Sequence, residues 1–296
     1  MMFSIVMPII RFSYLLGVAV AVDAGAPKEE HDNIQRFFRI GWPTFEKLIE
    51  WKDVHTFFVI VSQNDKDYFQ TIFEKHVPFV LQSKFKIIIE TDLMKYPTQK
   101  QKYSTQMMSK LLIANYVKTK HYLVVDDDIV VLRKFGMKDI FVNKQIRYTH
   151  DTTYNENWWV SSAHVLEMQL NDLDKSKMMS VTPEILIRRE VKNLMRYLQR
   201  LHGDWEYKLM NVKDRWTEYT LYWLYLSKQN KLGLYKKSRI PLSDNRTNIW
   251  FKPANIDESI EKMFKNKKQY FGVIQSNVPE NTYMAVEAAI KRIGIS

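Results

Sequence analysis

Short runs of apolar, often β-branched residues recur along the first half of the chain, with amphipathic stretches between them. The runs that read as strands are Phe3 to Ile10, Thr56 to Val61, Phe85 to Ile89 and Tyr122 to Val125. The segment from Ser104 to Lys118 is predicted to be a helix with one apolar face. That face carries Met108, Leu111, Leu112 and Tyr116. Strands that alternate with helices predict an α/β fold with a mostly parallel central sheet flanked by helices.

The first apolar run has two interpretations. As a core strand, the segment from Phe3 to Met7 is expected to stop at Pro8. The uncharged stretch 12–22 behind Arg11 instead suggests the core of a signal peptide, with small residues at 24–26. Pro8 and Arg11 interrupt the leader pattern, so the strand is favoured. The uncharged stretch is too short to cross a bilayer, and no stable membrane span is expected.

The second half of the chain predicts longer helices. The polar stretch 151–157 reads as a loop, and the stretch 178–181 reads as a short strand. Thr182-Pro183-Glu184 is predicted to open a long helix, with Thr182 as its N-cap. The later predicted elements are a helix over 217–228, a strand over 270–274 and a closing helix over 280–293. No repeat or linker divides the chain, so we expect a single compact domain over residues 1–296.

The chemistry of the chain centres on Asp126-Asp127-Asp128, which lies between two apolar runs. Three consecutive carboxylates repel one another, and burying them without a counter-cation is costly. At the carboxyl end of a parallel strand, where open α/β sheets bind ligands, they suit a hard divalent cation and a phosphate group. The same Asp-x-Asp spacing at 65–67 and 172–174 lacks the flanking strands. The alternative is an exposed acidic turn.

Charge and cysteine content narrow the classes of partner. The chain has 44 Lys and Arg against 33 Asp and Glu, a net charge of +11, which favours anionic partners. The basic residues are scattered, so nucleic acid is not expected as a partner. The absence of cysteine excludes disulfides and thiolate chemistry and fits the cytoplasm. If the N-terminus were a signal, Asn245-Arg246-Thr247 would be a glycosylation site in the secretory lumen.

Several segments resemble GT-A-type glycosyltransferases. In the first half these are Phe3 to Ile10, Gln106-x-x-x-Lys110-Leu111-Leu112, and Tyr122 to Val130. In the second half, Trp158 to Ser162, Met179 to Glu184 and Trp216 to Tyr219 are similar to an uncharacterised, chlorovirus-like branch found in bacteria and large DNA viruses of algae. The resemblance implies a GT-A (Rossmann-like) fold. It assigns nucleotide-sugar binding to residues 1–132 and acceptor binding to residues 133–296.

The resemblance also implies a metal-dependent glycosyltransferase that moves a sugar from a nucleoside-diphosphate sugar to a glycan hydroxyl. UDP-glucose, UDP-galactose and UDP-xylose are the expected donors, inversion is the expected outcome, and a viral capsid glycan in the host cytoplasm is one implied product. Mn²⁺ or Mg²⁺ is the expected ion. Asp128 would bind it directly, and Asp126 would hold the ribose or a metal-bound water. Strand alternation turns Asp127 the other way, so its place in the donor site is less secure.

Further candidates for donor binding follow the predicted strands. Lys110 is placed to reach the diphosphate or the base, although a solvated surface lysine is the alternative. The other nucleotide-binding candidates are Pro8, Arg11, Ser62 and Asp65. No histidine follows His202, so Asp244, Ser276-Asn277 or water is expected to complete the metal site.

For catalysis and acceptor binding, Glu218 is the favoured general base, with Asp151 and Glu184 in reserve. Its alternative role is to offset a helix dipole. Trp158, Trp159, His164 and Glu184 are expected to shape the acceptor pocket, because aromatic faces stack on sugars. The alternative for the tryptophan pair is ordinary core packing.

Two other classes of protein remain open at this point. A sugar-phosphate nucleotidyltransferase would need a glycine-rich phosphate loop near the N-terminus, where the chain has only Gly17 and Gly25. A non-catalytic basic binding module would not need an aspartate triplet between core strands.

Overall fold

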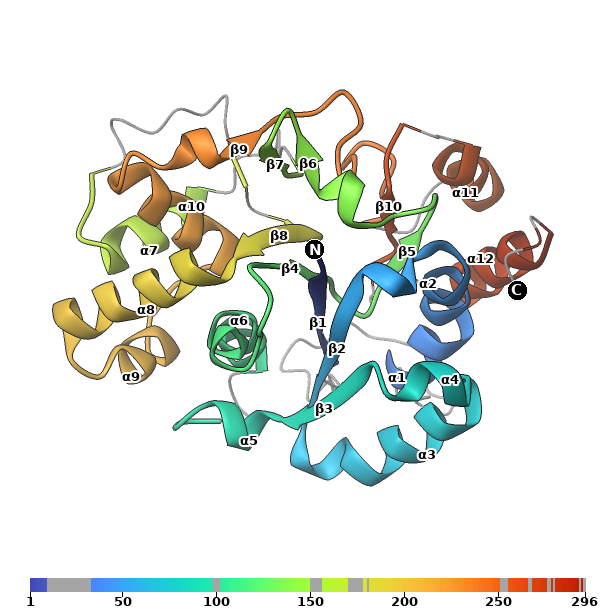
Figure 1. Ribbon diagram of the computed structural model, residues 1–296, viewed down its shortest axis with the longest axis horizontal. Coiled ribbons are helices and arrows are strands. Elements are labelled where there is room, and N and C mark those ends of the chain that lie inside the picture. The colour runs from blue at the N-terminus through green and yellow to red at the C-terminus, as the bar shows by residue number, and fades with distance from the viewer. Residues whose placement is uncertain are drawn as a thin grey trace, which may run out of the picture.

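The centre of the molecule is a five-stranded sheet with the order β3-β2-β1-β4-β8 (Figure 1). The computed structural model describes residues 1–9, 33–97, 102–149, 156–169, 178–179, 181–250, 255–265, 268–275, 278, 280–292 and 294. The parallel strands are β1 (Phe3–Ile9), β2 (Val54–Val61), β3 (Phe85–Ile89) and β4 (His121–Val124). At one edge, β8 (Glu184–Ile187) pairs antiparallel with β4. The expected α/β fold with a mostly parallel sheet flanked by helices is confirmed.

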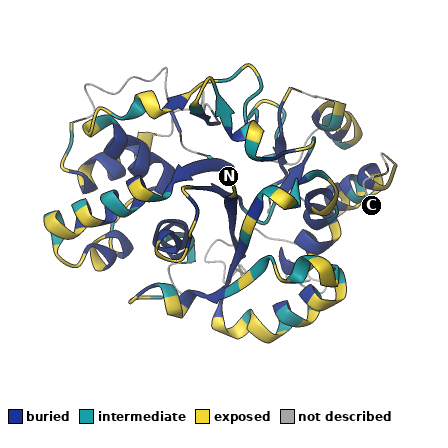
Figure 2. Cartoon of the chain, viewed as in Figure 1, coloured by how far each residue is buried: buried dark blue, intermediate teal, exposed yellow. Residues whose placement is uncertain are grey.

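The central strand β1 explains why the apolar pattern identified the sheet. All seven of its residues are buried. Figure 2 shows β4 and most of β2 buried as well, with exposed positions on the outer faces of the helices. Its residue Ile5 lies in register with Phe57 of β2 and Leu123 of β4. Parallel strands covered on both faces read as continuous apolar runs, which is the pattern seen in the sequence.

The expectation that β1 stops at Pro8 is wrong, because the strand continues to Ile9. The oxygen of Val6 accepts a hydrogen bond from Val125 N at 3.0 Å, so the backbone of Val6 faces the β4 side. Pro8, two residues later, faces the same side. There β4 has already ended at Val124, so the missing N–H of Pro8 has no strand partner to lose.

One helix predicted from the sequence packs against β1, and a second predicted helix packs against the first. Helix α6 (Lys102–Leu112) contacts β1 and continues into the 3₁₀ turn η5 (Ile113–Asn115). Helix α10 (Glu218–Lys228) packs against α6 and α7 (Glu156–Val165). Thr217 is its N-cap, because Thr217 Oγ1 accepts a hydrogen bond from Thr220 N at 3.0 Å. Helices α6 and α10 thus meet beside the carboxyl edge of the sheet.

The predicted helix start at Thr182-Pro183-Glu184 is wrong. Glu184 begins strand β8, and helix α8 starts at Arg188 and runs to His202. The apolar residues after Glu184 pair with β4, with Ile187 opposite His121. The short strand expected at 178–181 is also absent from the described residues of that stretch.

A smaller antiparallel pair extends the fold behind the aspartate triplet. Strand β5 (Ile129–Val131) pairs with β10 (Phe271–Val273), and helices α11 (Ile256–Lys265) and α12 (Glu280–Arg292) complete a second apolar cluster there. A third sheet contains β6 (Phe141–Val142), β7 (Gln145–Arg147) and β9 (Tyr235–Lys236). Of the helices described, none has the length and apolar character that a membrane crossing requires.

The remaining helical elements surround these sheets. They are α1 (Asn33–Arg36), η1 (Phe37–Gly41), α2 (Trp42–Leu48), η2 (Trp51–Asp53), η3 (Gln63–Asp65), α3 (Lys66–His76), α4 (Phe79–Gln82), α5 (Glu90–Leu93), η6 (Met137–Ile140), α9 (Trp205–Met210) and η7 (Leu232–Leu234).

The buried His121 predicts how stability depends on pH. Burial, followed by the charge of Lys120, lowers its pKa from the ordinary value of 6.5 to about 4. Between these pH values the unfolded chain binds a proton that the folded protein does not, so acidification removes about 1 kcal/mol of unfolding free energy per pH unit. We expect His121→Leu to show a shallower loss from pH 6.5 to 4 in urea unfolding.

The matched control is His55→Leu, because His55 is exposed. This variant should keep the pH dependence of the wild type. A His121→Leu variant with the wild-type slope would contradict the assignment.

Candidate active site

The aspartate triplet forms the turn between β4 and β5, at the carboxyl edge of the parallel strands. Two backbone hydrogen bonds hold the ends of this turn. Val125 N donates to Val6 O at 3.0 Å, and Ile274 N donates to Asp128 O at 2.9 Å. The turn is therefore fixed on one side by the central sheet and on the other by the segment after β10.

A cavity of about 510 Å³ opens over this turn, and all three aspartates line it. Its walls come from segments far apart in the sequence. Besides the aspartates, the lining residues are Tyr103, Gln106, Met107, Lys110, Trp158, Val181, Thr182, Arg215, Thr217, Glu218, Tyr219, Trp250 and Gln275. The start of α10 and one face of α6 thus face the acidic turn across the same space.

Lys110 joins the two sides of the cavity. Its Nζ lies 2.7 Å from Asp126 Oδ1 and 2.8 Å from Glu218 Oε1. The Lys110 side chain is 1% exposed, Glu218 is 0% exposed and Asp126 is 21% exposed. Gln106 Nε2 also donates to Asp126 Oδ1, at 3.3 Å. Lys110 is therefore a buried charge between two carboxylates, and the alternative of a solvated surface lysine is excluded.

The charge states of this cluster follow from burial and from the partners. Burial alone would lower the pKa of Lys110, but Asp126 and Glu218 together raise it above its usual value. Burial raises the pKa of Glu218, and the ammonium of Lys110 opposes this rise. The ion pair therefore favours the charged form of a deeply buried carboxylate, whereas burial favours its protonated form.

Among the described residues, fewer positive charges and hydrogen-bond donors offset the burial of the other two aspartates, so the pKa values of Asp127 and Asp128 are raised. Burial, followed by the charge of Asp126, raises the pKa of Asp127 to about 7, whereas Arg36 and a hydrogen bond with Asn33 oppose the shift. Burial and its two neighbours raise the pKa of Asp128 well above its usual value. Asp127 thus interacts with Asn33 and Arg36 of α1 while it also lines the cavity, so its place in the donor site stays a prediction.

The carboxylate oxygens of Asp126 and Asp128 suit a hard divalent cation as ligands. Asp128 Oδ1 is buried and has no hydrogen-bond partner among the described residues, which is the situation that a bound cation would relieve. In the same part of the chain, no group of three or more histidine or acidic side chains is arranged to hold a metal ion alone. Mg²⁺ is often held by one or two carboxylates together with substrate phosphates and water. Asp126 and Asp128 fit that mode, in which the ion binds together with the nucleotide.

Only some of the other candidate residues reach this cavity. Trp158 lines it, whereas the adjacent Trp159 is buried in the core and His164 is exposed on α7. Glu184 is buried in β8, where its two carboxylate oxygens accept from Thr149 N at 3.1 and 3.2 Å. The positions of Trp159, His164 and Glu184 thus do not contribute to the walls of the cavity.

The candidates that follow the first two strands do not line the cavity either. Pro8 is buried in β1. Ser62 Oγ donates to Asp65 Oδ2 at 2.7 Å and accepts from Asp65 N at 3.2 Å, so the two residues cap η3. Asp244 lies in a neighbouring loop, paired with Arg246. The candidates Arg11, Asp151, Ser276 and Asn277 lie outside the described residues.

Three residues of the cavity carry no signal in the sequence that singles them out. Arg215, Trp250 and Gln275 belong to no motif, and they reach the site through loops. The guanidinium of Arg215 lies 5.3 Å from the ring centre of Tyr103 on α6. Its position directly before the Trp216 to Tyr219 block is the one feature that would have drawn attention to it.

The ion cluster predicts a large stability difference between two lysine substitutions. Lys110→Met leaves the carboxylates of Asp126 and Glu218 without their shared cation, so we expect a loss of about 3–5 kcal/mol in urea unfolding. Adding Glu218→Gln to this variant should recover part of the loss. The control Lys265→Met breaks an exposed ion pair with Glu261 and should change stability little. Equal losses in the two single variants would contradict the role of Lys110.

Comparisons with known proteins give structural neighbours and a matching family. Among solved structures, mouse xyloside xylosyltransferase 1 in its apo form is 10% identical with a TM-score of 0.49, covering 94% of this chain and 99% of that one. The galactosyltransferase LgtC, solved with donor and acceptor sugar analogues, is 9% identical with a TM-score of 0.45, covering 97% and 96%. No curated protein gives a significant match. Residues 4–292 match the family described as "Family of unknown function (DUF6492)", and the chain belongs to that family.

Proposed function

We propose that this protein is a metal-dependent glycosyltransferase that transfers a sugar from a nucleoside-diphosphate sugar to a hydroxyl group of a glycan. One observation carries the proposal. A cavity at the carboxyl edge of a parallel sheet brings together the aspartate turn, the buried ammonium of Lys110 and the buried carboxylate of Glu218. Such a site suits a charged leaving group and a proton transfer.

The donor half of the site is the aspartate turn with Lys110. Asp126 and Asp128 would hold Mn²⁺ or Mg²⁺, which when bound neutralises charge that develops on the departing diphosphate. Lys110 holds Asp126 in place through the ion pair of 2.7 Å. The proposed donors are UDP-linked hexoses or pentoses such as UDP-glucose, UDP-galactose or UDP-xylose.

Glu218 is the general base in this proposal. Its Oε1 is held by Lys110, whereas its Oε2 has no hydrogen-bond partner in the described part of the chain. In the proposed reaction the acceptor oxygen bonds to the anomeric carbon, the bond from that carbon to the diphosphate breaks, and the hydroxyl proton passes to Oε2. Attack opposite the leaving group inverts the configuration. The indole ring of Trp158 offers a face for the sugar.

The cysteine-free composition supports placing this reaction in the cytoplasm. The resemblance of the sequence to the branch found in algal viruses makes a capsid glycan one acceptor within the proposal.

Asp128→Asn tests the donor site. Calorimetric titration of the wild type with UDP-sugars should show binding that depends on Mn²⁺. Since removing an outer partner of a metal ligand already costs about 10–100-fold in affinity, loss of a direct ligand should cost at least as much. The control Asp92→Asn, an exposed position on α5, should bind as the wild type does. Absence of binding to any nucleotide sugar, with or without metal, would refute the proposed function.

Glu218→Gln tests the proton transfer. We expect kcat to fall by about 10²–10⁴-fold while UDP affinity stays close to that of the wild type, because the amide cannot accept the proton. Because burial raises the pKa of Glu218, wild-type kcat should rise with pH as this group loses its proton, and the variant should lose that rise. Glu261→Gln, at an exposed position on α11, is the control. An unchanged kcat in Glu218→Gln would exclude this residue as the base.

A further inference from the structure

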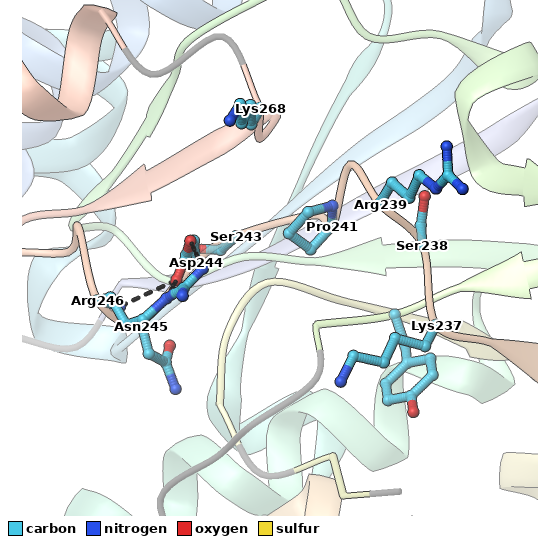
Figure 3. A pocket seen from close by; sticks show the side chains of 10 residues that line it. Lys237, Ser238, Arg239, Pro241, Ser243, Asp244, Asn245, Arg246 and Lys268 are labelled. Carbon is cyan, nitrogen blue, oxygen red and sulfur yellow. Dashed lines mark hydrogen bonds and ion pairs between the residues drawn. The ribbon is translucent and has the colours of Figure 1, made fainter.

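A second hollow, of about 270 Å³, lies in the loop that follows β9 (Figure 3). Four cationic side chains line this basic pocket, namely Lys237, Arg239, Arg246 and Lys268. Tyr148 forms part of its wall, and the pocket includes the hydroxyl-bearing residues Ser238 and Ser243. None of these residues takes part in the proposed donor site.

The basic pocket adjoins the candidate active site through Trp250. This residue lines the active-site cavity, and its Nε1 donates to Asn245 O at 3.3 Å. Asn245 in turn lines the basic pocket. One loop therefore supplies residues to both hollows.

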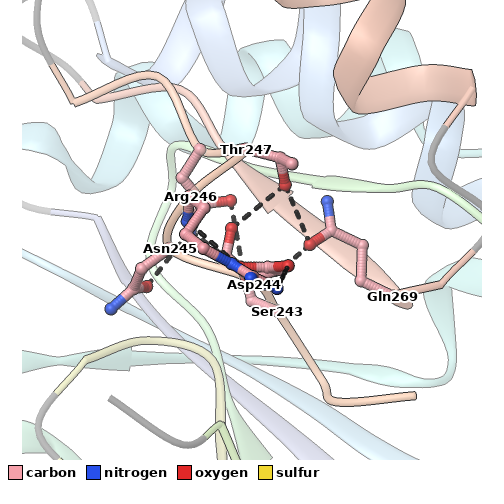
Figure 4. A network of polar contacts seen from close by, with 7 residues as sticks. Ser243, Asp244, Asn245, Arg246, Thr247 and Gln269 are labelled. Carbon is pink, nitrogen blue, oxygen red and sulfur yellow. Dashed lines mark hydrogen bonds and ion pairs between the residues drawn. The ribbon is translucent and has the colours of Figure 1, made fainter. Parts of the chain in front are cut away.

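The charge of the basic pocket is not balanced by its own residues. Its one acidic residue, Asp244, is already paired, because Arg246 Nε donates to Asp244 Oδ1 at 2.9 Å and Arg246 Nη2 donates to Oδ2 at 2.7 Å (Figure 4). Lys237 and Arg239 have no ion-pair partner within the described part of the chain. Among the described residues that line the hollow, the charge is therefore net positive.

Hydrogen bonds from residues outside the loop fix the conformation of the loop that carries these cations. Buried Arg147 donates from Nε to Asp139 O at 2.7 Å and from Nη1 to Ser238 Oγ and Ile240 O. These acceptors are neutral oxygens, and among the described residues no direct ion pair cancels the positive charge of the guanidinium, although the carboxylate of Asp139 lies close enough to influence it. On the other side, Gln269 Oε1 accepts from Asp244 N at 2.6 Å (Figure 4).

We propose that the basic pocket binds the anionic group of an acidic sugar, a phosphate or a carboxylate, and that the acceptor of the transfer is therefore an acidic glycan. The statement about the acceptor rests on the proposed function, whereas the binding itself does not. Arginine and lysine pair well with both anions. The volume lies just below the roughly 300 Å³ at which drug-sized sites begin, so one charged sugar unit fills the pocket while the next unit reaches Trp250.

The experiment uses three probes, glucose 6-phosphate, glucuronate and glucose, each titrated calorimetrically into the full chain. At least one acidic probe should bind about tenfold or more tightly than glucose. The double variant Lys237→Ala/Arg239→Ala should lose that preference. The variant Lys75→Ala/Lys208→Ala removes the same amount of charge from exposed positions on α3 and α9. This variant should keep the preference for acidic probes. Preference for one acidic probe alone identifies phosphate or carboxylate as the bound group.

Three results would overturn the proposal. Glucose binding as tightly as both acidic probes is the first, and a preference that survives in the Lys237→Ala/Arg239→Ala variant is the second. The third is an acidic probe whose binding is lost in Lys110→Met and kept in the pocket variant, because it would then occupy the active-site cavity. Binding of UDP-sugars with Mn²⁺ is measured on the same variants and should not change in the pocket variant. If UDP-sugars fail to bind while acidic sugars bind, the proposed function fails and the basic pocket stands.

Discussion

Lys110 places a positive charge in the interior of the protein, and the arrangement around it depends on compensating that charge. Removing an ammonium group from water costs several kcal/mol, which is recovered only through close and well-aligned partners. The partners here are Asp126, in the turn after β4, and Glu218, at the start of α10. Because Lys110 itself belongs to α6, the three segments are constrained together. The shape of the active-site cavity therefore follows from one ion cluster.

The sequence predicted the parallel core well, because β1 and β4 are buried throughout and β2 along most of its length, and such strands appear as continuous apolar runs. The edge strand β3 is only partly buried, but its residues are apolar except for Lys86. The strand β8 was missed for a physical reason. Thr182-Pro183-Glu184 has the local signature of a helix start, but pairing with β4, some 60 residues earlier in the chain, prevails over this local preference. A contact between segments so far apart leaves no periodic signal in either segment.

The site was predictable in the same uneven way. The aspartate turn was identified because it follows a predicted strand, and Glu218 because it lies near the start of a predicted helix in a segment that resembles GT-A glycosyltransferases. Trp158 and Trp159 are adjacent in α7, where neighbouring side chains point about 100° apart, so only one of them reaches the cavity. Ser62 and Asp65 satisfy each other as a local cap, a role that the sequence cannot distinguish from ligand binding. Loop residues such as Arg215 and Trp250 are brought in by tertiary structure alone.

The backbone hydrogen bond from Ile274 to Asp128 has a consequence for synthesis on the ribosome. The strand that supports the acidic turn, β10, begins at Phe271, whereas β5 ends at Val131, a gap of 271 − 131 = 140 residues. At about 5–20 residues per second, translation needs roughly 7–30 s to cover that distance. During this interval β10 has not yet been synthesised, so the aspartate turn of the nascent chain lacks the hydrogen bond from Ile274. The site is therefore among the last parts of the molecule to assemble, so an incomplete chain cannot hold it in its final form.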